Sequence, residues 1–217
     1  NIRVALAEGN LPRVLATALL PLTIYLLLRT LEENGGRWQQ LGLALCFGLI
    51  VITHAMMAAI YAACSLLLVL LYLIMRATTL RRALPAITSL LLGLALSGWW
   101  LLPSLSGGIT ELDSSALTEA QAVFPLTTYL NPLLRRGNPE IVYVGAVLLV
   151  AAGVALFVSR GRDRRTVALT ITGLFGLLIT TPGFNTLFNA LPMHSLFWPL
   201  RFLGFASFAL LLALVWR

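Results

Sequence analysis

The sequence contains no lysine: all 15 of its basic residues are arginines, which we attribute to a GC-rich genome rather than to chemistry. Charged residues of both signs make up only 11% of the 217 residues, whereas a soluble domain usually contains about 25%. Apolar residues make up 59%, and they recur along the whole chain in runs of roughly 20, the length that crosses a membrane as a helix. We therefore expect an all-α, polytopic membrane protein.

Cysteines and catalytic motifs are also scarce. The two cysteines, Cys46 and Cys64, lie inside apolar runs, where we expect small buried side chains, and no metal-ligand spacing exists. The sequence has no Walker loop, no dinucleotide-binding fingerprint, no Gly-x-Ser-x-Gly elbow and no His-Glu-x-x-His motif, which excludes a built-in ATPase. The net charge of +7 does not indicate nucleic acid, because the arginines occupy short loops between apolar runs. Membrane lipid is the expected partner.

The chain begins at Asn1 without a methionine, and its first ten residues contain no apolar segment of a signal peptide. We therefore interpret residues 1–217 as one transmembrane domain that is an internal piece of a longer polypeptide.

About seven helices are predicted from the apolar runs. These runs cover residues 11–28, 41–75, 84–105, 141–158, 166–181 and 200–216. Residues 41–75 contain no charge, and as a single helix they would be about 52 Å long. The hydrocarbon core is only about 30 Å thick. This run is therefore either one long helix that projects into water or two helices with a break near Thr53 and His54. We favour two, although no glycine or proline marks a turn there.

Arginine-rich loops predict the orientation in the membrane. "RATTLRR" and "SRGRDRR" carry three and four arginines, and the positive-inside rule places both in the cytoplasm. Residues 106–140 and 183–199 then form two outer loops. Three aromatic residues would lie at the outer interface: Trp99, Trp100 and Trp198.

The N-terminal half has two possible orientations. If residues 41–75 cross twice, Arg29 and Arg37 are inside and Arg3 and Arg13 are outside, with the N-terminus outside. A single crossing would exchange the two pairs.

Arg201 stands at the start of the last apolar run, just after Pro199. The unpaired N–H groups of a first helical turn and the positive end of the helix dipole favour an anion there. An arginine fork adds two parallel donors for a phosphate. The alternative is an arginine that extends to the interface and meets lipid headgroups.

Four other residues are candidate contacts. His54 lies within an apolar run, where it is either a packing or capping residue or a contact to a phosphate or sugar. Glu111 and Asp113 in "TELD" either bind a divalent cation, act as a base, or are solvated loop charges. His194 lies in the second outer loop and is a weaker candidate for an outer-loop contact.

Several stretches in order resemble a known family: "NLPRVLATALLPLTIYLL", "LALCFGLIVITHAMMAAIY", "LALSGWWLLPSL" and "HSLFWPLRFLGFASFALLLAL". Together they resemble the membrane proteins named as 6-pyruvoyl-tetrahydropterin synthase-related and their relatives in the GT-C glycosyltransferase superfamily. The resemblance spans most of the chain, although each motif is short. It implies a GT-C-like helix bundle in a bacterial or archaeal plasma membrane that transfers a sugar from a polyprenyl-phosphate donor on the outer face.

The resemblance also assigns positions. Arg201 matches the family's Pro-x-Arg position and His54 its Ser/Thr-His position, whereas Leu200 stands where a second aromatic residue is usual. The family's catalytic carboxylate, a base or metal ligand, lies in the first outer loop, which would precede Asn1, so no catalytic residue is assigned. Two alternatives remain open: a transporter or flippase for a lipid-linked saccharide, and a membrane subunit without chemistry. A transporter would need cationic residues along a central cavity and usually internal repeats, and no clear repeat is visible.

Overall fold

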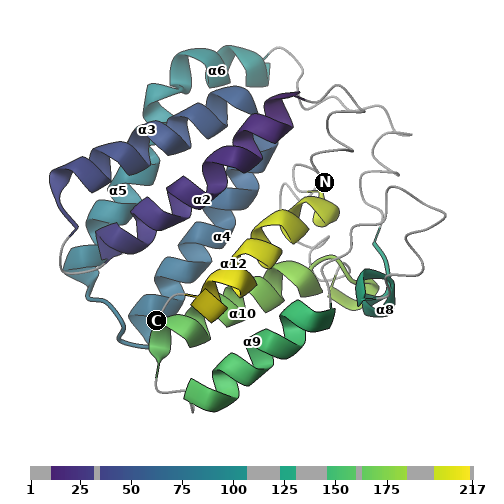
Figure 1. Ribbon diagram of the computed structural model, residues 1–217. Coiled ribbons are helices and arrows are strands. Elements are labelled where there is room, and N and C mark those ends of the chain that lie inside the picture. Colours follow the sequence, from purple (N-terminus) through teal and green to yellow (C-terminus); the bar gives the residue numbers. More distant parts are fainter. Residues whose placement is uncertain are drawn as a thin grey trace. The chain divides into compact units, whose positions relative to one another are not determined.

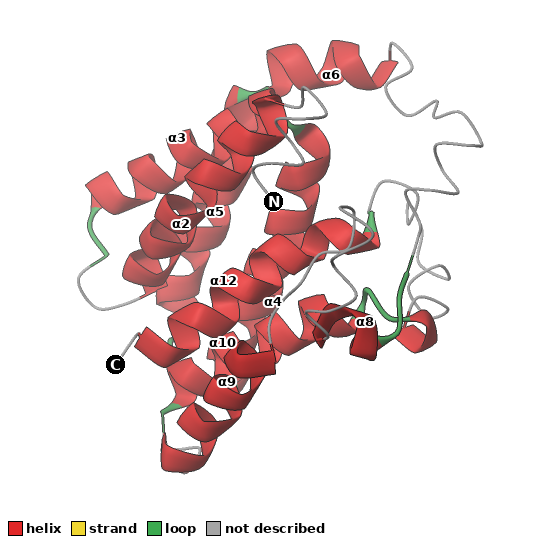
Figure 2. Ribbon diagram, turned by 45° about the vertical axis from the view of Figure 1, so that its right-hand side comes forward, coloured by secondary structure: helices red, strands yellow, loops and turns green. Residues whose placement is uncertain are grey.

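The computed structural model describes residues 11–31, 35–106, 123–130, 146–159, 163–184 and 198–215 (Figures 1 and 2). Within these ranges every regular element is a helix and no strand occurs, so the predicted all-α class is confirmed. The chain divides into two compact units, and each is described by itself. We call Ile2–Leu112 the first unit and Asp113–Arg217, with which Asn1 is grouped, the second unit.

Five helices make up the described part of the first unit. They are α2 (Leu11–Leu31), α3 (Arg37–Thr53), α4 (Ala55–Ile74), α5 (Leu80–Leu96) and the short α6 (Gly98–Ser106). The helices follow the apolar runs, because a backbone in an apolar surrounding must pair its polar groups within itself. Their bounds differ from the predicted runs at four places: α2 continues to Leu31 rather than residue 28, α3 begins at Arg37 rather than residue 41, and α5 begins at Leu80 rather than residue 84. The predicted run 84–105 also breaks at Ser97.

The run 41–75 consists of two helices, as the favoured interpretation predicts. His54 separates α3 from α4 with an extended backbone (φ −160°, ψ 90°). Its N–H donates to the Ile50 carbonyl at 2.8 Å, and its Nδ1 accepts a hydrogen bond from the Met57 N–H at 3.4 Å. One residue therefore ends α3 and caps α4, which explains how the chain breaks without glycine or proline.

Small residues allow α3 and α5 to approach closely. A Cβ atom added to Gly93 of α5 would lie 2.5 Å from the Ala44 carbonyl oxygen and 3.1 Å from the Gly48 nitrogen, both in α3. At the end of the same contact, the Ser97 hydroxyl donates to the Gly48 carbonyl at 3.0 Å. Close packing over small residues and hydrogen bonds between helices is the mode of association that remains available where surrounding lipid is itself apolar.

Hydroxyl groups inside the apolar helices are paired with their own backbone. Thr23, Thr30, Thr170 and Thr172 are buried, and each hydroxyl donates to the carbonyl four residues earlier at 2.7 to 2.9 Å. Such bonds remove the cost of burying a hydroxyl without a partner. These threonines therefore need no ligand to explain them.

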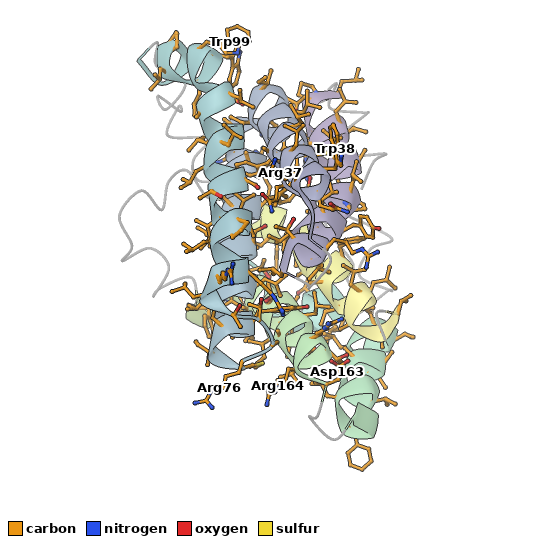
Figure 3. The ribbon with its side chains drawn as sticks, turned by 90° about the vertical axis from the view of Figure 1, so that its left-hand side faces the viewer. Arg37, Trp38, Arg76, Trp99, Asp163 and Arg164 are labelled. Carbon is orange, nitrogen blue, oxygen red and sulfur yellow. The ribbon has the colours of Figure 1, made fainter. Side chains whose placement is uncertain are left out.

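The first unit has two distinct ends. α2 and α4 end where α3 and α5 begin, and there the Thr78 hydroxyl donates to the Leu31 carbonyl at 2.9 Å. We call this the arginine end, because the described arginines at it are Arg29, Arg37, Arg76, Arg81 and Arg82. We call the opposite end the His54 end; it carries α6, the start of α2 and a single described arginine, Arg13. Figure 3 shows Arg76 and Trp99 at these opposite ends.

This arrangement predicts which positions share a side of the membrane. Trp38 and Thr79 lie at the arginine end and Trp99 at the His54 end; Trp38 and Trp99 are 82% and 72% exposed. We expect W38C and T79C to react with a membrane-impermeant maleimide only after cells are permeabilised, and W99C to react in intact cells. The buried Cys46 and Cys64, replaced by alanine, provide the background. Labelling of W38C and T79C from opposite sides would instead support a single crossing by residues 41–75.

The second unit contains α8 (Leu126–Leu130), α9 (Ala146–Ser159), α10 (Arg164–Leu178), the 3-10 turn η3 (Pro199–Arg201) and α12 (Phe202–Val215). α10 and α12 run antiparallel, since Gly173 lies against Leu210 whereas Gly176 lies against Ala206 and Phe202. Arg201 and the C-terminal end of α10 therefore share one end, which we call the Arg201 end.

Asp163 starts α10 at the opposite end of the second unit. Its carboxylate accepts hydrogen bonds from the Arg165 N–H at 3.0 Å and the Thr166 hydroxyl at 2.5 Å. This is a helix N-cap, and the negative charge also suits the positive end of the helix dipole. An arginine-rich loop thus contains one acidic residue with a structural role, which charge counting alone does not reveal.

Candidate functional site

Arg201 ends a 3-10 turn that leads directly into α12. Pro199 begins this turn, and the Arg201 N–H donates to the Trp198 carbonyl at 3.0 Å. In a 3-10 turn the side chains at positions i and i+3 are eclipsed. The Arg201 guanidinium accordingly lies over the Trp198 ring, with its central carbon 4.0 Å from the ring centroid. Stacking of this kind contributes about 0.5–2 kcal/mol, depending on how far the pair is desolvated.

The backbone that carries Arg201 rests on a packed base. Pro199 and Phe202, two residues before and one after Arg201, are buried. Next along α12, Leu203 and Ala206 form a core cluster with Leu177 of α10. Leu200, Phe124 and the α9 residues Leu148 and Leu149 pack against this cluster. A side chain on such a base has little freedom of position, which a precise ligand contact requires.

Phe124, in the described part of the predicted outer loop 106–140, lies at the Arg201 end of the second unit. The Phe124 N–H donates to the Thr180 carbonyl, just beyond the end of α10, at 3.3 Å. Phe124 also packs against the cluster beneath Arg201. Residues of the loop 106–140 and the start of α12 therefore lie at the same end of the second unit, as the predicted topology requires.

The ring of Trp198 positions the Arg201 guanidinium by stacking against one of its faces. The ring occupies one face of the Arg201 group, and the planar guanidinium matches a two-oxygen ligand in geometry. The indole Nε1 is buried and has no hydrogen-bond partner within the described ranges. The site thus joins a half-buried cation, an aromatic surface and a helix start.

His54 is a capping residue in the first unit. It is half-buried, and its Nδ1 accepts the hydrogen bond that begins α4. The capping alternative is therefore confirmed, and a contact to phosphate or sugar stays a prediction. His54 belongs to the first unit and Arg201 to the second, so each is a candidate position within its own unit.

One basic residue at the His54 end was not among the sequence candidates. Arg13 and Thr17 of α2 are close enough to the hydroxyl of Tyr61 in α4, whose side chain is fully buried, to interact with it electrostatically. From the sequence, Arg13 serves only to predict the orientation of the N-terminal half in the membrane. Arg13 directly follows Pro12 at the entry of an apolar helix, and Arg201 follows Pro199 with one residue between them; this similarity is a signal that could have identified Arg13.

Three candidates lie outside the described residues: Glu111, Asp113 and His194. Within the described ranges, no group of three or more His, Cys, Asp or Glu side chains comes together in a way that could hold a metal ion. A divalent cation at Glu111 and Asp113 stays a prediction.

Apolar helices long enough to cross a membrane indicate the class of protein. Among the described helices, α2 and α4 are long and apolar enough to cross a membrane, while α3 and the segment Pro199–Val215 are shorter apolar helices. The regular elements of the described residues are all helices. Over residues 1–217 the chain matches the 6-pyruvoyl-tetrahydropterin synthase related domain, which is described as a membrane protein, and it belongs to that family. No curated protein sequence and no solved structure matches the chain.

Proposed function

We propose that this chain is the membrane part of a GT-C-type glycosyltransferase, which transfers a sugar from a polyprenyl-phosphate donor on the outer face of the membrane. In this proposal Arg201 binds the donor phosphate. One observation carries it: the guanidinium of Arg201 is held on the face of Trp198 at the mouth of an apolar helix, where a lipid-linked phosphate would lie. The two parts of the donor would bind different surfaces there: its phosphate would bind Arg201, and its polyprenyl chain would pack along apolar helices.

The proposed reaction needs a base and a stabilised leaving group. An acceptor oxygen forms a bond to the anomeric carbon of the sugar while the bond from that carbon to the phosphate oxygen breaks. The acceptor proton passes to a carboxylate, and polyprenyl phosphate leaves with one additional negative charge. Arg201 stabilises this developing charge, which is the usual role of a fixed cation at a transferring group.

The carboxylate lies outside the described residues. Asp163 is the one acidic residue within them, and it caps α10 at the end of the second unit opposite Arg201. The family resemblance implies a carboxylate in a loop that would precede Asn1, and within this chain Glu111 and Asp113 of the outer loop 106–140 are the candidates for a base or metal ligand. His54 is a candidate contact to phosphate or sugar.

The charge distribution favours the transferase over a transporter or flippase. A transporter for a lipid-linked saccharide would need polar or cationic groups near the bilayer midplane. Among the described residues, arginines occur at helix ends and at connections between helices. The middle parts of these helices carry buried hydroxyl residues that bond to backbone carbonyls: Thr23, Ser89, Thr170 and Thr172.

An assay in proteoliposomes separates these possibilities. The full-length protein is reconstituted with polyprenyl phosphate that carries a radiolabelled monosaccharide, and an extract of acceptor glycans is added on the outer side. We expect protein-dependent release of unlabelled polyprenyl phosphate together with labelled glycan. Label that crosses the bilayer while still attached to the lipid would support a flippase, and no change in either quantity would support a subunit without chemistry.

A further inference from the structure

Arg76 has a backbone conformation that arginine rarely adopts. Its φ is 55°, and it is the one residue other than glycine with a positive φ within the described ranges. It follows the last turn of α4, where the Ala77 N–H donates to the Tyr72 carbonyl at 2.8 Å and the Arg76 N–H donates to the Leu73 carbonyl at 3.0 Å. This pair of bonds ends many helices, and the residue at the position of Arg76 is usually glycine, because a Cβ atom crowds the following carbonyl.

An arginine at a position suited to glycine lowers the stability of the fold. The backbone therefore does not explain why residue 76 is an arginine, and a role of its charged side chain is the remaining explanation. A residue held in an unfavourable conformation is a reason to look for a function. The side chain of Arg76 is exposed and projects away from the end of α4 (Figure 3). The residues around Arg76 therefore determine which kind of ligand its charge can bind.

The surroundings of Arg76 are basic overall. The arginine end carries five arginines, and the connection between α2 and α3 contains two acidic residues, Glu32 and Glu33, which leaves a net charge of +3 by sequence. Arg29 is placed over the ring of Tyr25 at 5.8 Å, whereas Arg81 is exposed like Arg76. Such an end attracts anions.

Exposed apolar side chains accompany the exposed arginines. Ile74 and Leu80, which flank Arg76 and Arg81 in the chain, are 66% and 61% exposed. At a membrane interface, such apolar side chains enter the acyl region and the guanidinium groups reach the headgroups. The pattern therefore fits a lipid surface.

We propose that Arg76, assisted by Arg81, binds the phosphate of an anionic phospholipid at the arginine end of the first unit. The guanidinium fork matches the phosphodiester, and the apolar neighbours contact the acyl chains of the same leaflet. This inference does not depend on the proposed transfer reaction. It explains why arginine occupies a position where glycine would be more stable.

Replacing Arg76 with glycine gives two readouts that move in opposite directions. The full-length protein in a neutral detergent is titrated with phosphatidylglycerol or phosphatidylcholine, and bound lipid is counted by native mass spectrometry. We expect R76G to lower the apparent affinity for phosphatidylglycerol about fivefold, the factor that one arginine near an anionic surface contributes. Without added lipid, we expect the Tm of R76G to rise by about 2 °C, because the strained backbone is relieved.

Further variants and probes keep the test decisive. R76N, which tolerates a left-handed backbone, should reproduce both effects, and R76K should retain only part of the affinity, because lysine keeps the charge but lacks the planar fork. R164Q, at an exposed arginine of the second unit, is the matched control and should leave the affinity of this site unchanged. Unchanged phosphatidylglycerol binding by R76G and R76N, or equal binding of the two lipids by the wild type, would overturn the proposal in favour of an acidic protein partner. Displacement of the lipid by equimolar inorganic phosphate would overturn it in favour of a soluble phosphate.

Discussion

Replacing Arg201 with alanine should lower the affinity for a polyprenyl-phosphate donor about a hundredfold. A hydrogen bond to a charged group contributes about 1.5–3 kcal/mol, and the upper value corresponds to a factor of more than 100. Turnover should fall further, by an additional factor of about 10²–10³, because the leaving phosphate gains charge in the transition state. The measurement is donor binding and release of polyprenyl phosphate by the full-length protein in proteoliposomes.

Lysine at position 201 distinguishes charge from geometry. R201K keeps the positive charge but loses the planar fork and most of the stacking on Trp198. We therefore expect a partial recovery of donor affinity, between the alanine variant and the wild type. If R201A binds the donor and turns it over like the wild type, Arg201 is a lipid-facing anchor and not a phosphate contact.

The matched control for Arg201 lies in the same unit. Arg164 is exposed in the first turn of α10, at the end opposite Arg201. Arg164→Ala removes the same charge and a comparable side chain without touching the proposed site. Its donor affinity should equal that of the wild type, and a similar loss in both variants would point to a general effect of net charge.

Replacing Gly93 with alanine should destabilise the first unit strongly. The new methyl group would lie 2.5 Å from the Ala44 carbonyl oxygen, so α3 and α5 would have to separate. Overpacking of this kind costs about 1–3 kcal/mol, and backbone atoms cannot move aside as a flexible side chain can. We expect the Tm in detergent to fall by roughly 2–12 °C, because 1 kcal/mol corresponds to about 2–4 °C for chains of this size.

A second helical glycine provides the control. Gly153 lies inside α9, and an added Cβ atom there would meet nothing within 4 Å. Gly153→Ala should be neutral or should stabilise by up to about 1 kcal/mol, because alanine is the better helix former. Equal Tm values for G93A and G153A would mean that α3 and α5 do not pack through Gly93 and Gly48.

The sequence predicts the helices well, because their main determinant is local. An apolar run without charge must form a helix in an apolar solvent, and its length limits how often it can cross. The break within residues 41–75 follows from that length limit. Its position at His54 agrees with the only polar pair in the run, Thr53 and His54, although histidine is an uncommon capping residue.

Other features depend on contacts that no single stretch encodes. The break at Ser97 occurs where its hydroxyl bonds to the Gly48 carbonyl, 49 residues earlier in the chain. The electrostatic interaction of Arg13 with Tyr61 likewise needs α2 and α4 to be packed. The stacking of Arg201 on Trp198 is an intermediate case: their spacing of three residues after a proline is visible in the sequence, but eclipsed side chains follow only once the turn is known to be 3-10.

Two hydrogen bonds restrict how the helices of the first unit can move. Ser97 bonds to the backbone of α3 at the His54 end, and Thr78 bonds to the last residue of α2 at the arginine end. If α5 slid past α3 by one turn, about 5.4 Å, the Ser97 bond would break and Gly93 would move away from the Ala44 carbonyl. If α2 slid in the same way, its bond with Thr78 would break. Sliding is therefore costly, whereas bending at His54 and Ser97 leaves both bonds in place. Any change of shape in this unit should proceed by hinging at these two residues, with the register between helices preserved.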